Sequence, residues 1–551
     1  MSLFSRRTNV KIKMRDGVAL SCNIIFPAGK GKFPTVLART PYNKESYNIS
    51  SELVRRYLES GYVHISQDVR GKFDSDGVFD PFNETEDGYD TIMWIASQPW
   101  SNGKVGMIGG SYGGFTQIYP AKLAPAPLQA ITPSVIGSNP VKNIIYKNGV
   151  LQFPIVSWIL NTAAGRSALS QPVEDWNEFF TNVPIHDMAT ANGFEIPAFE
   201  NWMSRTVADK YWDTFNIDAF IGKIDIPVFL AGGWYDFYSD VPLRLFSEMK
   251  KNASMKKKVK VIMGPWLHAL STDRIVGQID FGVSSLMDIE LIKKLWLDRF
   301  IKGEKNGIDK EAPLKIFVMG INKWRDEYEW PLKRTEYTSF HIGSGNSANS
   351  MHGDGFLSEE KHESKSEKDL FIYNPLNPVP SIGGATLGPL IGGPFDQRPA
   401  ERRDDVLVYS SRALKKALEV TGPVRMELYV SSSAPDTDFI ARLCDVYPDG
   451  RSINLCDGII RTRFRKGFEK ELMMEKEKIY KLEIDMDAIS NVFLPGHMIR
   501  LEITSSCFPR FARNFNTGKK NIDEKNPFIA EQIIYHSKKH PSRLILPLIN
   551  Q

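Results

Sequence analysis

The arrangement of apolar runs between residues 10 and 140 constrains the fold more than any other feature of the chain. Runs such as PTVLART and YVHISQDVR, which are rich in strand-forming residues, alternate with stretches such as SSELVRRYLESG and EDGYDTIMWIASQ, whose apolar residues recur at helical spacing. Strands that alternate with helices are typical of βα units around a mostly parallel sheet. We therefore predict that an α/β domain begins here.

The alternation stops and later returns. Residues 141–224 carry aromatic-rich helical patterns such as FENWMSRTVADKYWDTF and no clear strand. After them, IPVFLAGGWYDF and VKVIMGPWLHA are strand-like again, and ELIKKLWLDRFIKG is helical. The simplest organisation is an α/β domain in two parts, residues 1–140 and 225–330, with residues 141–224 inserted as a helical cap.

Residues 331–551 have a different sequence pattern. Short β-type runs such as VRMELYVSS, DFIARLCDVY and MIRLEITSS are separated by turn residues. This spacing is typical of a β-sandwich or jelly roll. We predict that the chain ends in an all-β domain of this kind.

Charge and composition exclude several classes of protein. The chain has 69 Lys+Arg against 65 Asp+Glu, a net charge of +4, so we expect no nucleic-acid partner. The most apolar window, VLQFPIVSWIL at 150–160, is too short to span a membrane, and the first residues lack the apolar core of a secretory signal. The four cysteines show no metal-binding or disulfide pattern, so we expect a cytoplasmic protein.

Two charged stretches have alternative interpretations. KKNASMKKKVKV, at 250–261, fits a solvated loop entering a strand better than an anion-binding patch. DSDGVFD, at 74–80, fits a solvated turn better than a metal site, because the calcium-loop pattern is incomplete.

The stretch VGMIGGSYGGF contains a motif that points to chemistry. Its residues 109–113 match G-x-S-x-G between a strand-like run and a helix-capable run. This context favours a sharp turn that exposes the Ser111 hydroxyl and points the Tyr112 N–H to where an oxyanion would form. The alternatives are an ordinary glycine-rich turn and a phosphate loop, although the lysine of the latter is missing.

The glycines around Ser111 have separate predicted tasks. We expect Gly109 and Gly113 to let the strand and the helix approach closely, and Gly110 and Gly114 to keep side chains away from the turn.

A serine nucleophile needs a general base and an acid that orients it, and in the α/β-hydrolase fold these follow in the order Ser, Asp, His. Asp236 comes just after the strand-like IPVFLAGG, and His268 just after VKVIMG. Among the nine histidines, His268 alone has this position. Asp240 is a rival acid further from the strand end.

Ordered stretches along nearly the whole chain carry a family resemblance. They are RTPYNK, QDVRGKFDSDGVF, EDGYDTIMWIASQPWSNGKVGMIGGSYGG, GGWYDF, GPWLH, YNPLNPVPSIGG, DQRPAERRDDVLVYSS and FPRFARNFNTG. With them the chain resembles the CocE/NonD family of serine hydrolases, which includes bacterial cocaine esterase, α-amino acid ester hydrolases and X-prolyl dipeptidyl peptidases. It departs from the family at Lys72 and Phe73, where another Arg-Gly is usual.

The resemblance implies Ser111 as nucleophile, His268 as general base and acid, and Asp236 as the residue that orients the imidazole. It also implies that the Tyr42 hydroxyl joins the Tyr112 N–H in the oxyanion hole. No metal or organic cofactor is implied. The expected partner is a small ester, amide or short peptide, and self-association is known among relatives.

The substrate is less defined. Trp158 and Tyr238 match the approximate positions of pocket aromatics in the family, with core packing as the alternative. Asp240 is the only acid shortly after Asp236, which argues against an amino-ester substrate. The sequence favours a carboxylesterase or acylase. The alternatives are an X-prolyl dipeptidyl peptidase, an α-amino acid ester hydrolase, or a carbohydrate- or partner-binding protein on an inactive scaffold.

Overall fold

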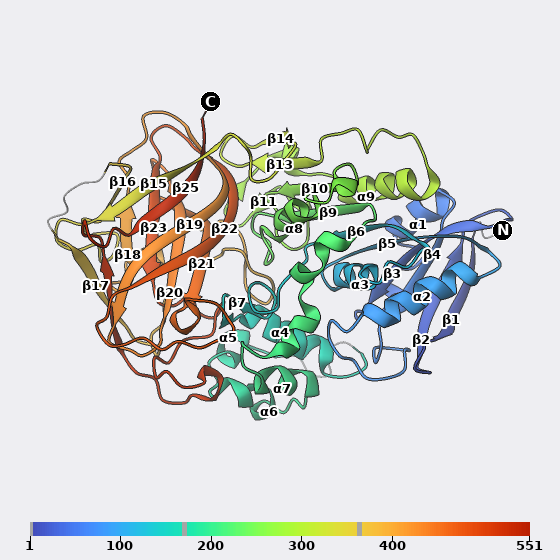
Figure 1. The fold of residues 1–551 in the computed structure, drawn as a ribbon, viewed down its shortest axis with the longest axis horizontal. Helices are drawn as coiled ribbons and strands as arrows, with labels where there is room; N and C mark the ends of the chain where they lie inside the picture. The colour runs from blue at the N-terminus through green and yellow to red at the C-terminus, as the bar shows by residue number, and fades with distance from the viewer. Residues whose placement is uncertain (1–3, 168–172, 361–365, 551) are drawn as a thin grey trace.

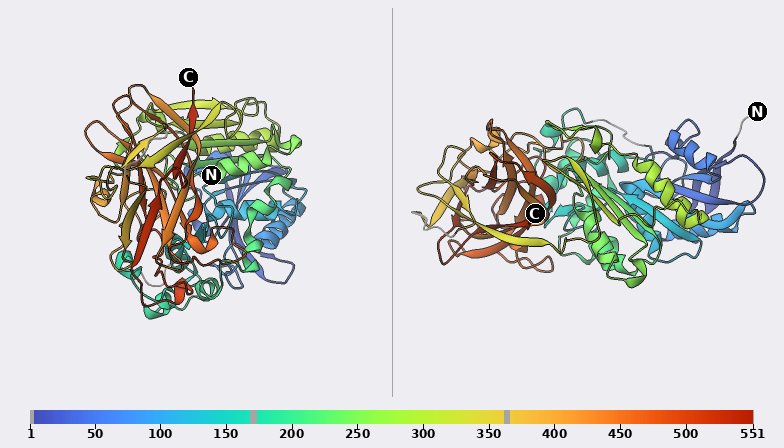
Figure 2. Two further views of the ribbon diagram at one scale, coloured as in Figure 1. Left: turned by 60° about the vertical axis from the view of Figure 1, so that its left-hand side comes forward. Right: turned by 90° about the horizontal axis from the view of Figure 1, so that it is seen from above.

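The computed structural model describes residues 4–167, 173–360 and 366–550. The α/β part, the helical insertion and the C-terminal β part each occupy their own region (Figure 1). Seen from above, the β part and the N-terminal strands lie at opposite ends of an elongated molecule (Figure 2). This arrangement confirms the predicted fold class.

The α/β part is built on one sheet with the strand order β1-β2-β4-β3-β5-β6-β9-β10-β13-β14. The strands from β4 to β13 in this order are parallel, and β1, β2 and β14 add antiparallel edges. The bounds are β1 Ser5–Lys13, β2 Ala19–Phe26, β3 Phe33–Thr40, β4 Val63–Asp68, β5 Ser101–Gly110, β6 Leu128–Ser134, β9 Val228–Gly233, β10 Val259–Gly264, β13 Leu314–Val318 and β14 Lys323–Glu327.

Helices cover both faces of this sheet because its central strands are apolar on both sides. Along β3, Val36 and Ala38 join the core beneath α1 and α9, whereas Leu37 joins the core beneath α2, α3 and α8. The bounds are α1 Glu52–Glu59, α2 Thr85–Ser97, α3 Tyr112–Ala121, α8 Val241–Met249 and α9 Ile289–Leu297. A small hairpin, β11 Ile275–Val276 and β12 Ile279–Asp280, follows β10.

The insertion after β6 is mostly short helices. They are α4 Phe153–Ala163, α5 Trp176–Phe179, α6 Met188–Ala191 and α7 Pro197–Ser204. The expectation of no strands here is wrong in one detail, because β7 Tyr146–Lys147 and β8 Val150–Leu151 pair as a two-stranded hairpin ahead of α4. Each strand has only two residues, too few to give a periodic signal.

Within its described residues, the C-terminal part consists of β-strands, as predicted, with one short α-helix, α10 Arg398–Glu401, and the 3-10 turns Thr462–Phe464 and Asn521–Asp523. Its strand order is β17-β24-β19-β25-β15-β16-β18-β23-β20-β21, with β22 also paired to β19. The bounds are β15 Thr335–Gly343, β16 Phe356–Ser358, β17 Lys368–Tyr373, β18 Leu407–Ser410, β19 Leu418–Ser432, β20 Asp438–Val446, β21 Ser452–Arg461, β22 Tyr480–Phe493, β23 Met498–Thr504, β24 Ala530–Tyr535 and β25 Arg543–Ile549.

Backbone contacts tie the three parts together. Gln152, just before α4, bridges to Phe511, and the Phe153 N–H donates to the carbonyl of Arg510. Met319, just after β13, bridges to Asn491 of β22. In the described part of the chain, no helix combines the length and the apolar character that crossing a membrane requires.

Candidate active site

Ser111 occupies the sharp turn between β5 and α3. Its backbone has φ 55° and ψ −125°, a conformation that residues other than glycine rarely adopt. Such strain is typical of a turn that raises a nucleophilic hydroxyl above the carboxyl edge of a sheet. The local geometry therefore agrees with the motif prediction.

Two of the glycines around Ser111 are sterically required. A Cβ on Gly109, whose φ is +139°, would lie 2.9 Å from the carbonyl oxygen of Gly113, so strand and helix do meet closely here. A Cβ on Gly114 would lie 2.3 Å from Cγ2 of Ile136. At Gly110 and Gly113 the nearest atoms would be 3.4 and 3.6 Å away, so these positions have room for a methyl group.

Asp236 and His268 are brought together by two neighbouring strands. β9 and β10 are parallel and in register to their last residues, so the loops that follow them leave the same edge of the sheet. His268 Nδ1 lies 2.6 Å from Oδ1 of Asp236. Asp236 is fully buried, whereas a quarter of the His268 side chain is exposed. With Nδ1 facing the acid, Nε2 is the nitrogen left for a reacting group.

The rival acid, Asp240, is engaged elsewhere. It lies just before α8, and its carboxylate pairs with Arg244 at 2.8 Å. Burial raises the pKa of Asp240, and Arg244 opposes that shift. The structure therefore pairs Asp236, rather than Asp240, with the histidine.

Tyr42 lies in the loop after β3, with its hydroxyl at Ser111. The hydroxyl accepts a hydrogen bond from the indole Nε1–H of Trp158 at 2.8 Å, and the Ser111 hydroxyl lies near enough to oppose part of the rise in the pKa of the phenol. Tyr42 keeps 41% of its surface exposed, yet loss of water around the hydroxyl raises its pKa to about 12. The phenol is therefore a protonated donor at neutral pH.

Tyr112 begins α3, so its backbone N–H has no acceptor within the helix. Its side chain is buried, and two hydrogen bonds fix its hydroxyl. The hydroxyl donates to the Glu84 carboxylate at 2.8 Å and accepts from the Phe82 N–H at 2.9 Å. Glu84 in turn pairs with Arg39 at 2.7 Å, and both are buried. This network fixes the side chain of the residue whose N–H is predicted to bind the oxyanion.

Sequence reasoning missed the pair of Arg39 and Glu84. Arg39 could have been noticed as the one charged residue inside the apolar run PTVLART. A charged residue on a central strand is rarely buried without a partner, so an ion pair could have been expected. The partner could not be read from the sequence, since Glu84 lies in a loop 45 positions away.

The two predicted pocket aromatics lie close to this site. Trp158 stacks on Tyr112 with ring centroids 5.6 Å apart, and on Phe82 at 5.7 Å. Tyr238 is buried, with its ring 6.0 Å from that of His268. Trp158 thus contacts the Tyr42 hydroxyl directly, whereas the ring of Tyr238 packs near the imidazole of His268.

The helix that carries Trp158 is anchored by Lys72, one of the two residues that depart from the family pattern. Lys72 is fully buried, and its Nζ donates to the carbonyls of Thr162 and Gly165 at the end of α4. Burial and the nearby charge of Arg166 lower the pKa of Lys72 to about 8. The lysine connects the loop after β4 to the insertion.

A loop of the β part, residues 381–394, also reaches the site. The carbonyl of Gly388 accepts from the Ser157 hydroxyl at 3.3 Å, next to Trp158. Gly392 packs on Leu267, next to His268, where an added Cβ would come within 3.1 Å of the leucine. All three parts of the chain therefore meet around the histidine and the tryptophan, and no local pattern had indicated this loop.

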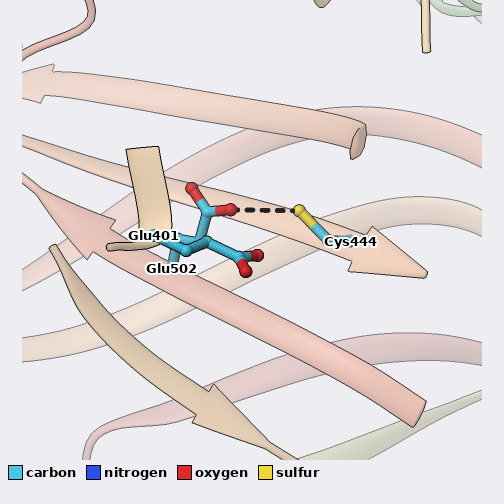
Figure 3. Close-up of side chains that lie close together, drawn as sticks. All are labelled: Glu401, Cys444 and Glu502. Carbon is cyan, nitrogen blue, oxygen red and sulfur yellow. Dashed lines mark hydrogen bonds between the residues drawn. The ribbon is translucent and has the colours of Figure 1, made fainter. Parts of the chain in front are cut away.

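One buried group in the β part resembles a metal site by distance. Glu401, Cys444 and Glu502 could each offer a ligand atom within 4.8 Å of one another (Figure 3). Arg500 already binds Glu401 at 2.6 Å, and Arg442 binds Glu502 at 2.8 Å. These guanidinium groups occupy carboxyl oxygens, and burial raises the pKa of Glu401 and of the Cys444 thiol, so that both groups favour their protonated forms and the donor set does not favour a cation.

The acids of the DSDGVFD turn have partners too. Asp74 pairs with the buried Lys44, and Asp76 pairs with Lys11 at 2.9 Å. These ion pairs agree with the interpretation of this stretch as a turn.

Family models cover both large parts of the chain. The model described as "X-Pro dipeptidyl-peptidase (S15 family)" matches residues 16–270, and the model of its C-terminal non-catalytic domain matches residues 306–545. A curated relative, "Cocaine esterase" of Rhodococcus sp. (strain MB1 Bresler), is 36% identical over 100% of this chain and 99% of its own length. The chain belongs to the CocE/NonD family of serine hydrolases.

Solved structures agree with this membership. An aminopeptidase from a marine sediment Thaumarchaeota archaeon has a TM-score of 0.88 at 25% identity, covering 100% of this chain and 97% of its own. An α-amino acid ester hydrolase has a TM-score of 0.87 at 23% identity, covering 99% and 97%, and shows the same fold. This CocE/NonD hydrolase therefore shares its three-part architecture with an aminopeptidase and an α-amino acid ester hydrolase, two proteins named for different substrates.

Proposed function

We propose that this CocE/NonD hydrolase cleaves carboxylic esters with neutral acyl groups through an acyl-enzyme on Ser111. The observation that carries the proposal is the pairing of His268 with the buried Asp236 at the same edge of the parallel sheet as the strained Ser111 turn, with the Tyr42 hydroxyl near Ser111. Each of these groups has a defined task in acyl transfer.

In the proposed reaction Ser111 Oγ attacks the ester carbonyl while Nε2 of His268 takes its proton. Asp236 holds Nδ1–H and stabilises the imidazolium that forms. The negative charge on the carbonyl oxygen is received by the Tyr42 hydroxyl and the Tyr112 N–H. His268 then protonates the leaving alcohol, and water attacks the acyl-enzyme with His268 again as the base.

The charges near Asp236 favour a neutral acyl group. Asp240 is neutralised by Arg244, while Asp487 receives the Lys147 ammonium and the Ser239 hydroxyl. An amino-ester or a dipeptide substrate carries an ammonium group, which needs an unengaged carboxylate. Asp240 and Asp487, the carboxylates near the loop that follows β9, are already paired with the side chains of Arg244 and Lys147.

The similarity to cocaine esterase supports an ester substrate, and the X-Pro dipeptidyl-peptidase model keeps a peptide substrate as a second candidate. A panel of aryl and alkyl acyl esters, amino-acid esters and Xaa-Pro anilides, compared by kcat/KM, separates them. We expect the neutral esters to rank first. Preference for Xaa-Pro anilides would contradict the proposed substrate class while leaving the nucleophile intact.

Labelling with a fluorophosphonate probe tests the nucleophile itself. We expect the wild-type protein to be labelled and Ser111→Ala to be unlabelled. Ser134→Ala is the matched control, because this nearby serine is buried and its hydroxyl lacks a hydrogen-bond partner in the structure. Folded wild-type protein that resists labelling would instead favour a binding protein on an inactive scaffold.

The state of the cysteines supports the predicted cytoplasmic location. All four are free thiols, and Cys22, Cys444 and Cys507 are buried. Proteins of oxidising compartments more often pair their cysteines. Self-association stays a prediction, which light scattering of the purified protein would test.

A further inference from the structure

The side chain of Trp158 contacts both residues that are proposed to bind the oxyanion, the hydroxyl of Tyr42 and the ring of Tyr112. Its Nε1–H donates to the Tyr42 hydroxyl at 2.8 Å, and its ring stacks on that of Tyr112 at 5.6 Å with an interplanar angle of 19°. Tyr42 comes from the loop after β3, Tyr112 from the start of α3, and Trp158 from α4 of the insertion. One residue of the insertion therefore links two segments of the α/β part.

The direction of the hydrogen bond between Trp158 and Tyr42 is unambiguous. An indole nitrogen only donates, so the phenolic oxygen must accept. A phenol has a single proton, and because the indole engages one side of its oxygen as a donor, that proton is left for an acceptor on the other side, where the reacting carbonyl oxygen is proposed to lie. Accepting a hydrogen bond also strengthens the bond that a hydroxyl donates.

From this geometry we propose that Trp158 is a positioning residue of the oxyanion hole, which holds the Tyr42 hydroxyl so that its proton is directed at the reacting carbonyl oxygen. The inference rests on the proposed function, because it assigns Trp158 a task in the same acyl transfer. It differs from the role of a pocket wall, which would act through contact with the acyl group.

The surroundings of Trp158 fit a fixed donor. Its ring lies in a stack of near-parallel rings, 5.7 Å from Phe82 at 22° and 6.5 Å from Trp202 at 17°. The α4 helix is held at its end by the buried Lys72. A donor held by packing has less freedom to lose when the oxyanion forms.

A double-mutant cycle tests the proposal with p-nitrophenyl butyrate as the substrate. Tyr42→Phe removes the proposed donor and should lower kcat by about 10²–10³-fold. Trp158→Phe keeps an aromatic ring but removes the N–H, and should lower kcat by roughly 3- to 10-fold with little change in KM. In the Tyr42→Phe background, Trp158→Phe should have no further effect on kcat, because the hydroxyl on which it acts is gone.

Trp202→Phe is the matched control for loss of an indole from the same stack. Its Nε1 is buried and does not reach Tyr42, so any effect of this substitution on kcat should be equal in both backgrounds. Equal losses from Trp158→Phe in both backgrounds, or a change in KM alone, would overturn the proposal. Full turnover by Ser111→Ala would instead overturn the proposed function.

If Trp158→Phe does not fold, benzothienylalanine at position 158 replaces it. This residue keeps the bicyclic ring and exchanges only the N–H for sulfur. We expect the same loss in kcat as for Trp158→Phe. The loss should again occur in protein with Tyr42 and be absent from protein with Tyr42→Phe. Unchanged kcat in this variant would overturn the role of the N–H.

Discussion

Nδ1 of His268 lies 2.6 Å from Oδ1 of Asp236, although the residues are 32 positions apart and each stands in its own loop. The contact exists because β9 and β10 are adjacent and parallel. It fixes the orientation of the imidazole and leaves Nε2 for proton transfer.

Asp236→Asn should therefore lower kcat for ester hydrolysis by about 10⁴-fold, since an amide cannot hold the required tautomer or stabilise the imidazolium. Steady-state kinetics would measure the loss. Asp240→Asn is the control, because Asp240 pairs with Arg244 and should affect stability far more than kcat. Similar kcat values for the two variants would contradict the assignment of the acid.

The glycines at the turn predict a contrast in stability. Gly113→Ala should be neutral or stabilise the protein by up to about 1 kcal/mol, because the added Cβ has room and alanine favours helices. Gly114→Ala should destabilise it by about 1–3 kcal/mol, since the Cβ would overlap Ile136. Denaturant unfolding of both variants checks the order, and equal stabilities would refute the steric argument.

Lys72→Met should loosen the end of α4. The substitution leaves the carbonyls of Thr162 and Gly165 without their buried donor, at a cost of about 1–3 kcal/mol. We expect faster amide hydrogen exchange in residues 153–163 and a lower kcat. Lys122→Met, at an exposed lysine over the ring of Phe220, is the control and should leave this exchange unchanged.

The buried carboxyl group of Glu401 predicts a pH dependence of stability. Burial, with help from the charge of Glu502, raises the pKa of Glu401 to about 8, compared with about 4.3 in an unfolded chain. Between these values the folded state holds a proton that the unfolded state has lost, so its stability should fall as pH rises through this window.

Glu401→Gln removes this titration while its amide can still accept from Arg500. The melting temperature of the variant relative to wild type should therefore rise from pH 5.5 to pH 8.5, with a change in relative stability of a few kcal/mol. Thermal unfolding at the two pH values measures it. A difference that does not vary with pH would show that Glu401 is ionised throughout.

Much of the fold and of the candidate site could be predicted from sequence because the signals are local. Alternating strand and helix patterns indicated the parallel sheet, and the positions of Ser111, Asp236 and His268 just after strands placed them at one edge of it. The carboxyl ends of parallel strands meet in any such fold, so chain order alone was informative. Tyr42 needed the family resemblance, because a loop tyrosine carries no such signal.

The tertiary structure alone decided how these groups are supported. Trp158 meets the Tyr42 hydroxyl across 116 positions, Lys72 meets Gly165 across 93, and Gly388 meets Ser157 across 231. Each contact depends on how the insertion and the β part pack against the sheet, and on side-chain directions that no periodic pattern encodes. The sequence by itself determined the architecture and the groups proposed to react, whereas packing between distant segments determined which residues surround those groups.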